Sequence, residues 1–305
     1  MFGLGGRRHS ELLAEITSLR KEIQLLREER AAENITRQIK SIRNKIVSAE
    51  EIDSIIIDRI KKSFRFSDSL AIAIAAHSES PDKIFTIYNS QIGCKFYLPN
   101  GGSDHVQREI VRTSDFYEVK TLMLLRNSGL IPVAPAVVDV GANIGNHSVF
   151  FGKIMNASSI VAFEPNPPVF SILTRNIELN GLADITQLYC AAAGNVLAKA
   201  RSAGHKLNNL GENSIVEDEA GDIDIMRLDD LNLSAVDFLK IDVEGYGSMV
   251  LDGARHLISE HQPTILMEVT STAEREAVNR LQSEFAYRIH SDLGRDLILT
   301  ASGKA

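Results

Sequence analysis

Short apolar runs alternate with amphipathic stretches from about residue 135 onward. The runs are rich in Val, Ile, Leu and Phe, and the stretches between most of them have helical spacing. Nearly continuous apolar strands separated by helices are typical of a parallel sheet covered on both faces. The pattern therefore predicts a doubly wound, mostly parallel α/β sheet over residues 131–305. The predicted strands are Ala136–Val140, Ser159–Phe163, Ile185–Cys190, Asp237–Ile241 and Thr264–Val269, and the predicted helices are His147–Met155, Pro167–Leu179, Ser248–Glu260 and Ala273–Phe285.

Two further strand-like runs close the chain. Ala286–His290 and Asp296–Thr300 flank a short polar segment that contains Gly294. Strand-like runs joined by a few residues that include glycine are typical of a hairpin. We expect the last strand to run antiparallel to its neighbour.

Residues 1–62 have a different pattern, in which apolar residues recur at alternating spacings of three and four. Such spacing predicts a long helix or a coiled coil. The nine-residue step from Leu26 to Ile35 breaks the seven-residue repeat, so the seam shifts or the helix breaks there. Self-association through this helix predicts a homo-oligomer, although the helix could bind another protein or pack on its own domain. The apolar positions are Leu12, Ile16, Leu19, Ile23 and Leu26, then Ile35, Ile39, Ile42, Ile46 and Ala49.

Residues 63–130 form a lead-in to the α/β domain. Lys83–Tyr88 and Lys95–Leu98 have strand-like composition, and the segment from Pro99 supplies a turn. Asp115–Asn127 is predicted to be helical and to end at Ser128 and Gly129.

Composition limits the classes of protein that fit. The 305 residues are 44% hydrophobic and 24% charged, with a formal net charge of -7. This balance supports a folded core, and it argues against nucleic acid as the main partner. No apolar run reaches the roughly 20 residues that span a bilayer, and no secretory signal is apparent, so we expect a cytoplasmic protein. The two cysteines, Cys94 and Cys190, are too few for a disulfide framework or a zinc site, and both are expected to be buried.

Candidate chemistry begins at the glycine turn after the first predicted strand of the domain. Gly141 and Gly145 follow Asp139, and Glu164 ends the next strand. An open carboxylate at Asp139 would repel a pyrophosphate and attract the ammonium and sulfonium of S-adenosylmethionine. Glu164 is placed to accept hydrogen bonds from ribose hydroxyls. Alternatively, the two acids cap helices or pair with basic side chains.

Five motifs, taken together in this order, resemble the FkbM family of class I methyltransferases, which depend on S-adenosylmethionine. The resemblance covers roughly residues 92 to 270. The motifs are Val138-Asp-Val-Gly-Ala-Asn-Ile-Gly-Asn-His-Ser148, Ala162-Phe-Glu-Pro-Asn166, Arg227-Leu-Asp-Asp-Leu231, Val236-Asp-Phe-Leu-Lys-Ile-Asp-Val-Glu-Gly245 and Pro263-Thr-Ile-Leu-Met-Glu-Val269.

The resemblance implies a Rossmann-like sheet of seven strands and methyl transfer to a hydroxyl of a carbohydrate, glycoconjugate or secondary metabolite. It also implies that Cys190–Ala193, with Ala192 among them, passes near the adenine. These small residues depart from the acidic or polar adenine partner of many class I enzymes. The residues implied to line the cofactor pocket are Asp139, Gly141, Asn143, Gly145 and Glu164.

The acceptor side needs a group that takes a proton, and three residues are candidates. Asp242 and Glu244 follow the fourth strand of the domain and reach the same rim as Asp139, and His147 opens the helix after the glycine turn. Asp242 could instead pair with Lys240 or cap a helix, and His147 could be a partly exposed residue bonded to backbone. Asp242 and Glu244 could also hold a divalent cation together with Glu268.

Other features leave the function open. Asn208, Asn209 and Asn213 lie in a polar segment that is a lid or a surface loop, and Tyr246 contacts the acceptor or packs internally. A nicotinamide-dependent oxidoreductase uses the same type of sheet, although the Gly-x-x-x-Gly spacing departs from the dinucleotide fingerprint. A further alternative is an inactive methyltransferase-like module that assembles with partners through its N-terminal helix.

Overall fold

The computed structural model describes residues 82–89, 92–202 and 215–303. The chain divides into two units, Met1–Arg65 and Phe66–Ala305, and all described residues belong to the second. The helix or coiled coil predicted over residues 1–62 therefore lies outside the described residues. The same holds for Asn208, Asn209 and Asn213.

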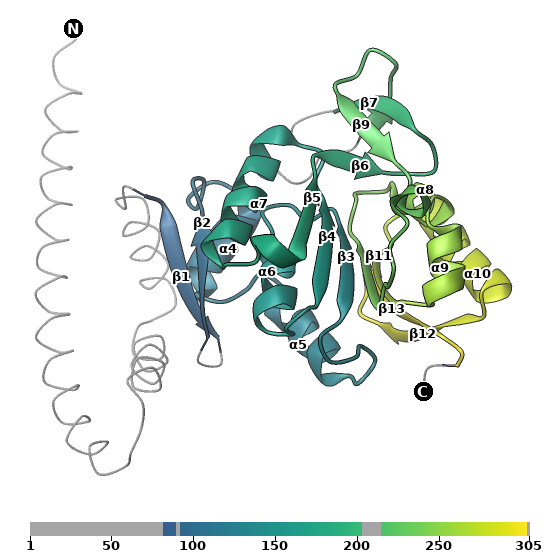
Figure 1. The fold of residues 1–305 in the computed structure, drawn as a ribbon, viewed down its shortest axis with the longest axis horizontal. Coiled ribbons are helices and arrows are strands. Elements are labelled where there is room, and N and C mark those ends of the chain that lie inside the picture. Colours follow the sequence, from purple (N-terminus) through teal and green to yellow (C-terminus); the bar gives the residue numbers. More distant parts are fainter. Residues whose placement is uncertain (1–81, 90–91, 203–214, 304–305) are drawn as a thin grey trace, which may run out of the picture. The chain divides into compact units, whose positions relative to one another are not determined.

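A seven-stranded sheet forms the centre of the described unit, in the order β12-β13-β11-β10-β3-β4-β5 (Figure 1). Neighbouring strands are parallel except around β13, which is antiparallel to both β11 and β12. The predicted sheet and its reversed last strand are confirmed. The bounds are β3 Ala136–Val140, β4 Ser159–Phe163, β5 Thr186–Tyr189, β10 Phe238–Ile241, β11 Thr264–Glu268, β12 Tyr287–Asp292 and β13 Asp296–Ala301.

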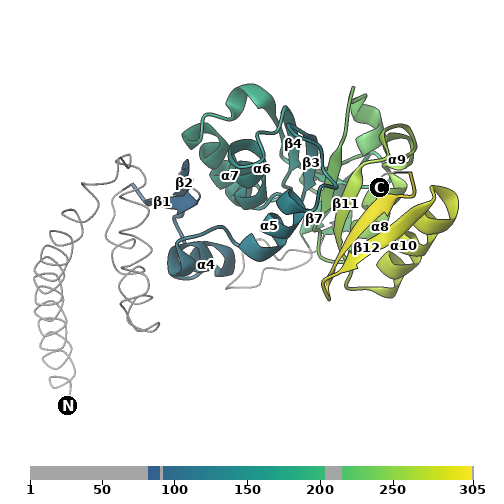
Figure 2. The same ribbon diagram turned by 90° about the horizontal axis from the view of Figure 1, so that it is seen from below.

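Alternate strand residues enter two separate hydrophobic cores, because successive side chains of a strand point to opposite faces. Val137 and Phe238 belong to one core, and Val138 and Leu239 belong to the other. Figure 2 shows the helices on both sides of the sheet. The first face carries α5 Val119–Asn127, α6 Asn146–Lys153 and α7 Pro167–Leu179, and the second carries α8 Gly247–Asp252, α9 Arg255–His261 and α10 Thr272–Glu284.

The helix predicted over Ser248–Glu260 is divided into α8 and α9. At Gly253 the chain passes so close to Gly194 that an added Cβ would lie 1.8 Å from the Gly194 carbonyl oxygen. The Asp229 carboxylate accepts hydrogen bonds from the backbone N–H groups of His256 and Leu257 at 3.1 and 2.9 Å. These two N–H groups lie in the first turn of α9, where they have no partner within the helix. Asp229 therefore caps α9 as a separate helix, and the predicted continuous helix is interrupted.

The lead-in contains a hairpin of β1 Ile84–Asn89 and β2 Ile92–Tyr97, and the unpredicted helix α4 His105–Thr113. Asp104 caps α4 by accepting from the N–H of Gln107 at 3.0 Å. The predicted helix from Asp115 begins only at Val119, because Glu118 has a left-handed backbone with φ of 55° that no α-helix accommodates.

The hairpin is attached to α7 by two asparagine side chains. The Oδ1 atom of Asn176 accepts from the Tyr97 N–H at 2.6 Å, and that of Asn180 accepts from the Lys95 N–H at 3.0 Å. The lead-in therefore packs on the same face of the central sheet as α6 and α7.

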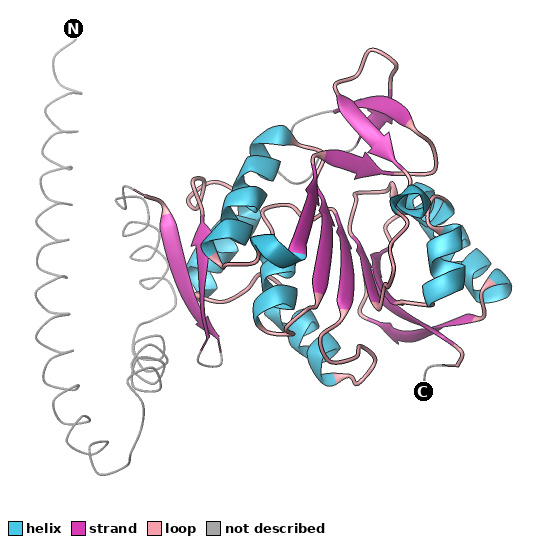
Figure 3. Ribbon diagram, viewed as in Figure 1, coloured by secondary structure: helices cyan, strands magenta, loops and turns pink. Residues whose placement is uncertain are grey.

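A second sheet of four strands was not predicted from the sequence. It has the order β6-β9-β7-β8 and follows β5 at the edge of the central sheet (Figure 3). Its bounds are β6 Ala191–Ala193, β7 Ala198–Ser202, β8 Ile215–Glu217 and β9 Ile223–Met226. Its core is small, with Ala192, Ala200, Ile223 and Ile225 buried. Such short strands carry too few apolar residues to give a clear alternating pattern.

Candidate functional site

The glycine turn between β3 and α6 lies at the carboxyl end of the sheet. Gly141 and Gly145 have φ of +78° and +84°, which L side chains rarely adopt. A Cβ on Gly141 would lie 1.9 Å from the carbonyl oxygen of Asp242, which follows β10. The first glycine is therefore required by close packing of two strand ends as well as by its backbone conformation.

Glu164 joins the end of β4 to this turn. Its side chain is buried, with the residue 5% exposed. One carboxylate oxygen accepts from the Asn143 N–H at 3.0 Å and the other from the Asn166 N–H at 2.9 Å. Burial raises the pKa of Glu164 to about 7, although the two backbone donors act in the opposite direction. Any further hydrogen-bond donor to this buried group would stabilise its charged carboxylate form.

Asp139 is not the open carboxylate that the sequence argument assumed. It is fully buried, and its Oδ1 atom lies 3.2 Å from the Nζ atom of Lys240 in β10. Its Oδ2 atom accepts from the Ser148 hydroxyl at 2.6 Å. The alternative of pairing with a base therefore describes Asp139, and its charge is already neutralised within the fold.

Lys240 occupies the centre of this edge of the sheet. Besides Asp139, it lies 3.3 Å from Asp242 and donates to the Gly141 carbonyl oxygen at 3.1 Å. Burial alone would lower the pKa of Lys240, but the Asp139 and Asp242 carboxylates outweigh burial and raise it. The pairing of Asp242 with Lys240, considered from the sequence, is present.

Further carboxylates surround Asp242 at the ends of β11 and β13. Glu268 and Asp296 are register partners, and Glu268 lies 2.7 Å from Arg295. Burial, with the Asp242 charge, raises the pKa of Glu268 to about 7. Burial, with the charges of Glu118 and Asp242, also raises the pKa of Asp296. This group of acids is called the acidic rim below, and its members are Glu118, Asp242, Glu268 and Asp296.

The acidic rim does not contain a metal-binding arrangement. Within the described ranges, no three His, Cys, Asp or Glu side chains are gathered as ligands of one ion. The described structure therefore gives no support to the cation site considered from the sequence at Asp242, Glu244 and Glu268. Glu244 instead sits in a tight turn, with φ of 36° and Gly245 at 85° after it.

Tyr246 follows that turn and connects it to the second sheet. Its hydroxyl donates to Glu217 of β8 at 3.2 Å. The hydroxyl thus has a partner inside the protein, which agrees with the packing alternative for Tyr246.

His147 is buried at the start of α6, with 5% of the residue exposed, and not partly exposed as one alternative held. Its Nε2 atom lies 3.4 Å from a carboxylate oxygen of Glu118, and its Nδ1 atom lies 3.4 Å from the amide nitrogen of Asn146. Sequence reasoning missed Glu118, because it lies in the lead-in, 29 residues before His147, and belongs to no recognisable motif.

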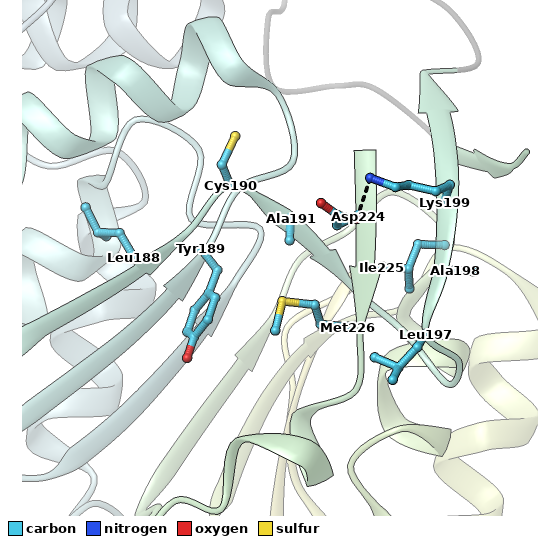
Figure 4. Close-up of a pocket in the computed structure, with 10 residues that line it drawn as sticks. All are labelled: Leu188, Tyr189, Cys190, Ala191, Leu197, Ala198, Lys199, Asp224, Ile225 and Met226. Carbon is cyan, nitrogen blue, oxygen red and sulfur yellow. Dashed lines mark ion pairs between the residues drawn. The ribbon is translucent and has the colours of Figure 1, made fainter. Parts of the chain in front are cut away.

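A cavity of about 540 Å³ opens where β5 passes into the second sheet. Figure 4 shows Cys190 and Ala191 on one side of it and the Lys199–Asp224 ion pair on the other. Cys190 is exposed, contrary to expectation, whereas Cys94 is buried as expected. Ala192 is buried in the core of the second sheet. The residues that line the cavity are Leu188, Tyr189, Cys190, Ala191, Leu197, Ala198, Lys199, Asp224, Ile225 and Met226.

Comparison with known proteins gives the class of the chain. Residues 139–293 match the model of the methyltransferase FkbM domain, which is half of the chain. The chain therefore belongs to the FkbM methyltransferase family, and the resemblance read from the five motifs is confirmed. The seven-stranded order, with one reversed strand, fits the class I, Rossmann-like fold.

Individual relatives cover only part of the chain. "Methyltransferase 1" of Beauveria bassiana is 29% identical over an alignment of 142 residues, and the match covers 38% of this chain and 57% of that protein. "Methyltransferase sdnD" of Sordaria araneosa is 28% identical over an alignment of 180 residues, and the match covers 47% of this chain and 68% of that protein. The chain thus spans little more than half the length of the first relative.

A solved structure of an FkbM methyltransferase from Methylobacillus flagellatus is 23% identical and has a TM-score of 0.42. It covers 56% of this chain, and 45% of that chain is covered. Among the described residues, no helix has the length and apolar character needed to cross a membrane.

Proposed function

We propose that the protein is an S-adenosylmethionine-dependent methyltransferase that methylates a hydroxyl of a small-molecule or glycan acceptor. Membership of the FkbM family supports methyl transfer, and two relatives carry the name methyltransferase. The observation that carries the proposal is Glu164, a buried acid beside a glycine turn whose described hydrogen bonds come from backbone N–H groups.

The hydrogen-bond acceptor sites that remain on Glu164 fit a nucleoside. A carboxylate has about four lone-pair sites, and the two backbone N–H groups use two of them. Ribose hydroxyls would donate to the remaining sites and stabilise the charged form that burial disfavours. We assign the backbone of Gly141, Asn143 and Gly145 to the cofactor side, and the Cys190–Ala193 segment with Ala192 to the base.

Asp139 has an indirect part in this assignment. Because its charge is held by Lys240 and its second oxygen by Ser148, it fixes the start of α6 and the glycine turn. The attraction for a sulfonium then comes from the acidic rim, where Asp242 is 43% exposed at its side chain.

The acceptor side is assigned to the rim and the turn after β10. Bound S-adenosylmethionine supplies an electrophilic methyl group on a positively charged sulfur. The chain has to orient the acceptor hydroxyl in line with that group, exclude water and take up one proton. We assign Asp242 and Glu244 the role of orienting acceptor hydroxyls, from which they would accept hydrogen bonds.

Calorimetry with S-adenosylmethionine, S-adenosylhomocysteine and NAD tests the cofactor. We expect binding of the first two and none of NAD. Glu164→Gln removes the charge that the ribose would stabilise, so it should weaken binding about tenfold or more, which corresponds to at least about 1.4 kcal/mol. Glu284→Gln is the matched control, because Glu284 pairs with Arg255 at the surface.

Transfer is measured as tritium moved from labelled S-adenosylmethionine into small molecules and glycans of a host extract. Tight NAD binding without cofactor binding would reject the proposal in favour of an oxidoreductase. Cofactor binding without any labelled product would favour an inactive assembly module.

A further inference from the structure

The beginning of α5 is clamped to the beginning of α6 by one side chain. The Oδ1 atom of Asn146 accepts from the Tyr117 N–H at 2.9 Å, and its Nδ2 atom donates to the Tyr117 carbonyl oxygen at 3.0 Å. Both bonds are made to the residue directly before Glu118. The lead-in is thereby held in a defined position over the carboxyl edge of the sheet.

This clamp also assigns the proton of His147. Since an amide nitrogen only donates, the contact of 3.4 Å between Asn146 Nδ2 and His147 Nδ1 makes Nδ1 an acceptor. The ring hydrogen is then on Nε2, which faces the Glu118 carboxylate at 3.4 Å. Nε2 forms no complete hydrogen bond with any described residue, and His147 is nearly fully buried. The Glu118 carboxylate, at 3.4 Å, is the group to which this buried N–H can donate after a small adjustment.

Glu118 itself reaches the surface of the site. Its side chain is 36% exposed, and its left-handed backbone, with φ of 55°, is a conformation that stores strain. The groups that act on it come from three further elements: His147 of α6, Lys240 of β10 and Asp296 of β13, besides the adjacent Tyr117. Burial raises the pKa of Glu118, but His147 and Lys240 outweigh burial and lower it.

Two other carboxylates of the acidic rim already form ion pairs with basic side chains. Asp242 lies 3.3 Å from Lys240, and Glu268 is largely buried against Arg295. Both ring nitrogens of His147 face protein groups, so the ring has no lone pair for an acceptor. Glu118 is an exposed carboxylate of the rim, and among the rim carboxylates it is the one that lies beside a buried histidine.

We propose that Glu118 is the catalytic base on the acceptor side and that His147 is its positioning residue. The proposal rests on the proposed methyl transfer. It places a reacting group in the lead-in, outside residues 139–293 that match the family model.

The proton inventory of the step balances. The acceptor oxygen forms a bond to the methyl carbon, and the electron pair of the broken carbon–sulfur bond stays on sulfur. The hydroxyl proton passes to the Glu118 carboxylate, which later releases it to water. A carboxylate is a sufficient base, because the hydroxyl becomes strongly acidic only as the new bond forms.

The first test compares four variants in methyl transfer to the host extract and in calorimetry with S-adenosylmethionine. Glu118→Gln should lower the transfer rate by about 10²-fold with unchanged cofactor affinity. His147→Ala should lower it by about tenfold, and His147→Gln, which keeps an N–H donor, should restore part of the loss. Glu284→Gln should match the wild type. Transfer by Glu118→Gln above half of the wild-type rate would overturn the proposal.

The second test needs neither cofactor nor acceptor. Carboxyl ¹³C NMR of the full chain should place the pKa of Glu118 below its ordinary value, and His147→Ala should raise it, because a donor to the charged form is lost. In the transfer assay of the first test, which supplies cofactor and acceptor, the acidic limb of the pH–rate profile should move to higher pH in His147→Ala and disappear in Glu118→Gln.

The two proposals fail in different ways. An unchanged Glu118 titration in His147→Ala would overturn the positioning role. Absence of cofactor binding in the wild type would overturn the proposed function instead.

Discussion

The glycine turn and the acidic rim are two halves of one edge of the sheet, and they hold their carboxylates differently. At the turn, Glu164 is bound by backbone N–H groups that lie within 21 residues of it. At the rim, Glu118 and Asp242 are held by His147 and Lys240 side chains. Backbone donors bring no net charge, so Glu164 remains open to a further donor. At the rim, by contrast, the neighbouring His147 and Lys240 side chains influence whether the carboxylates are charged.

Removal of Lys240 should have the largest effect on this arrangement. Lys240→Met leaves Asp139 buried without a counter-charge, so the free energy of unfolding should fall by about 3–5 kcal/mol. Denaturant unfolding measures the loss. Lys199→Met removes the exposed pair with Asp224 and should cost less than about 1 kcal/mol.

The double variant Lys240→Met with Asp139→Asn should recover much of that stability, because no buried charge is left unpaired. Equal losses in the single and double variants would show that Lys240 acts through packing and not through its charge.

A side chain at Gly141 should have the next largest effect. Gly141→Ala combines a left-handed backbone with a Cβ at 1.9 Å from the Asp242 carbonyl oxygen. The free energy of unfolding should fall by about 3 kcal/mol. Gly294→Ala also has positive φ but meets no atom within 4 Å, so it should cost about 1 kcal/mol. Similar losses of unfolding free energy in the two variants would mean that the ends of β3 and β10 move apart at little cost.

A further effect is a pH dependence that distinguishes Glu164 from a surface acid. A raised pKa of about 7 means that the folded protein retains a proton that the unfolded chain releases above about pH 4.5. The free energy of unfolding should therefore decrease as pH rises from about 4.5 to 7, and Glu164→Gln should reduce this slope, leaving the part due to Glu268, whose pKa is also raised to about 7. Unfolding curves across that range provide the measurement, and an unchanged slope would remove the buried acid from the cofactor side.

The glycine turn was largely predictable, whereas the rim was not. Gly141, Gly145 and Glu164 follow strands whose apolar residues identify them, and α/β topology brings consecutive strand ends together. Glu118 and Asp296 have no such signal, because the first lies in a lead-in and the second begins the reversed strand. The exposure of Cys190 was predicted wrongly, and the second sheet was missed because its short strands resemble a loop.

The sequence alone determined the strands of the central sheet, the reversed final strand and the family, because these depend on local periodicity and on contiguous motifs. Only the tertiary structure decided which charges are neutralised. Lys240 and Asp139 are 101 residues apart in the chain and become partners through the register of β10 with β3. A carboxylate at a strand end has the same sequence signal whether it is open or paired, because its charge depends on distances that only folding creates.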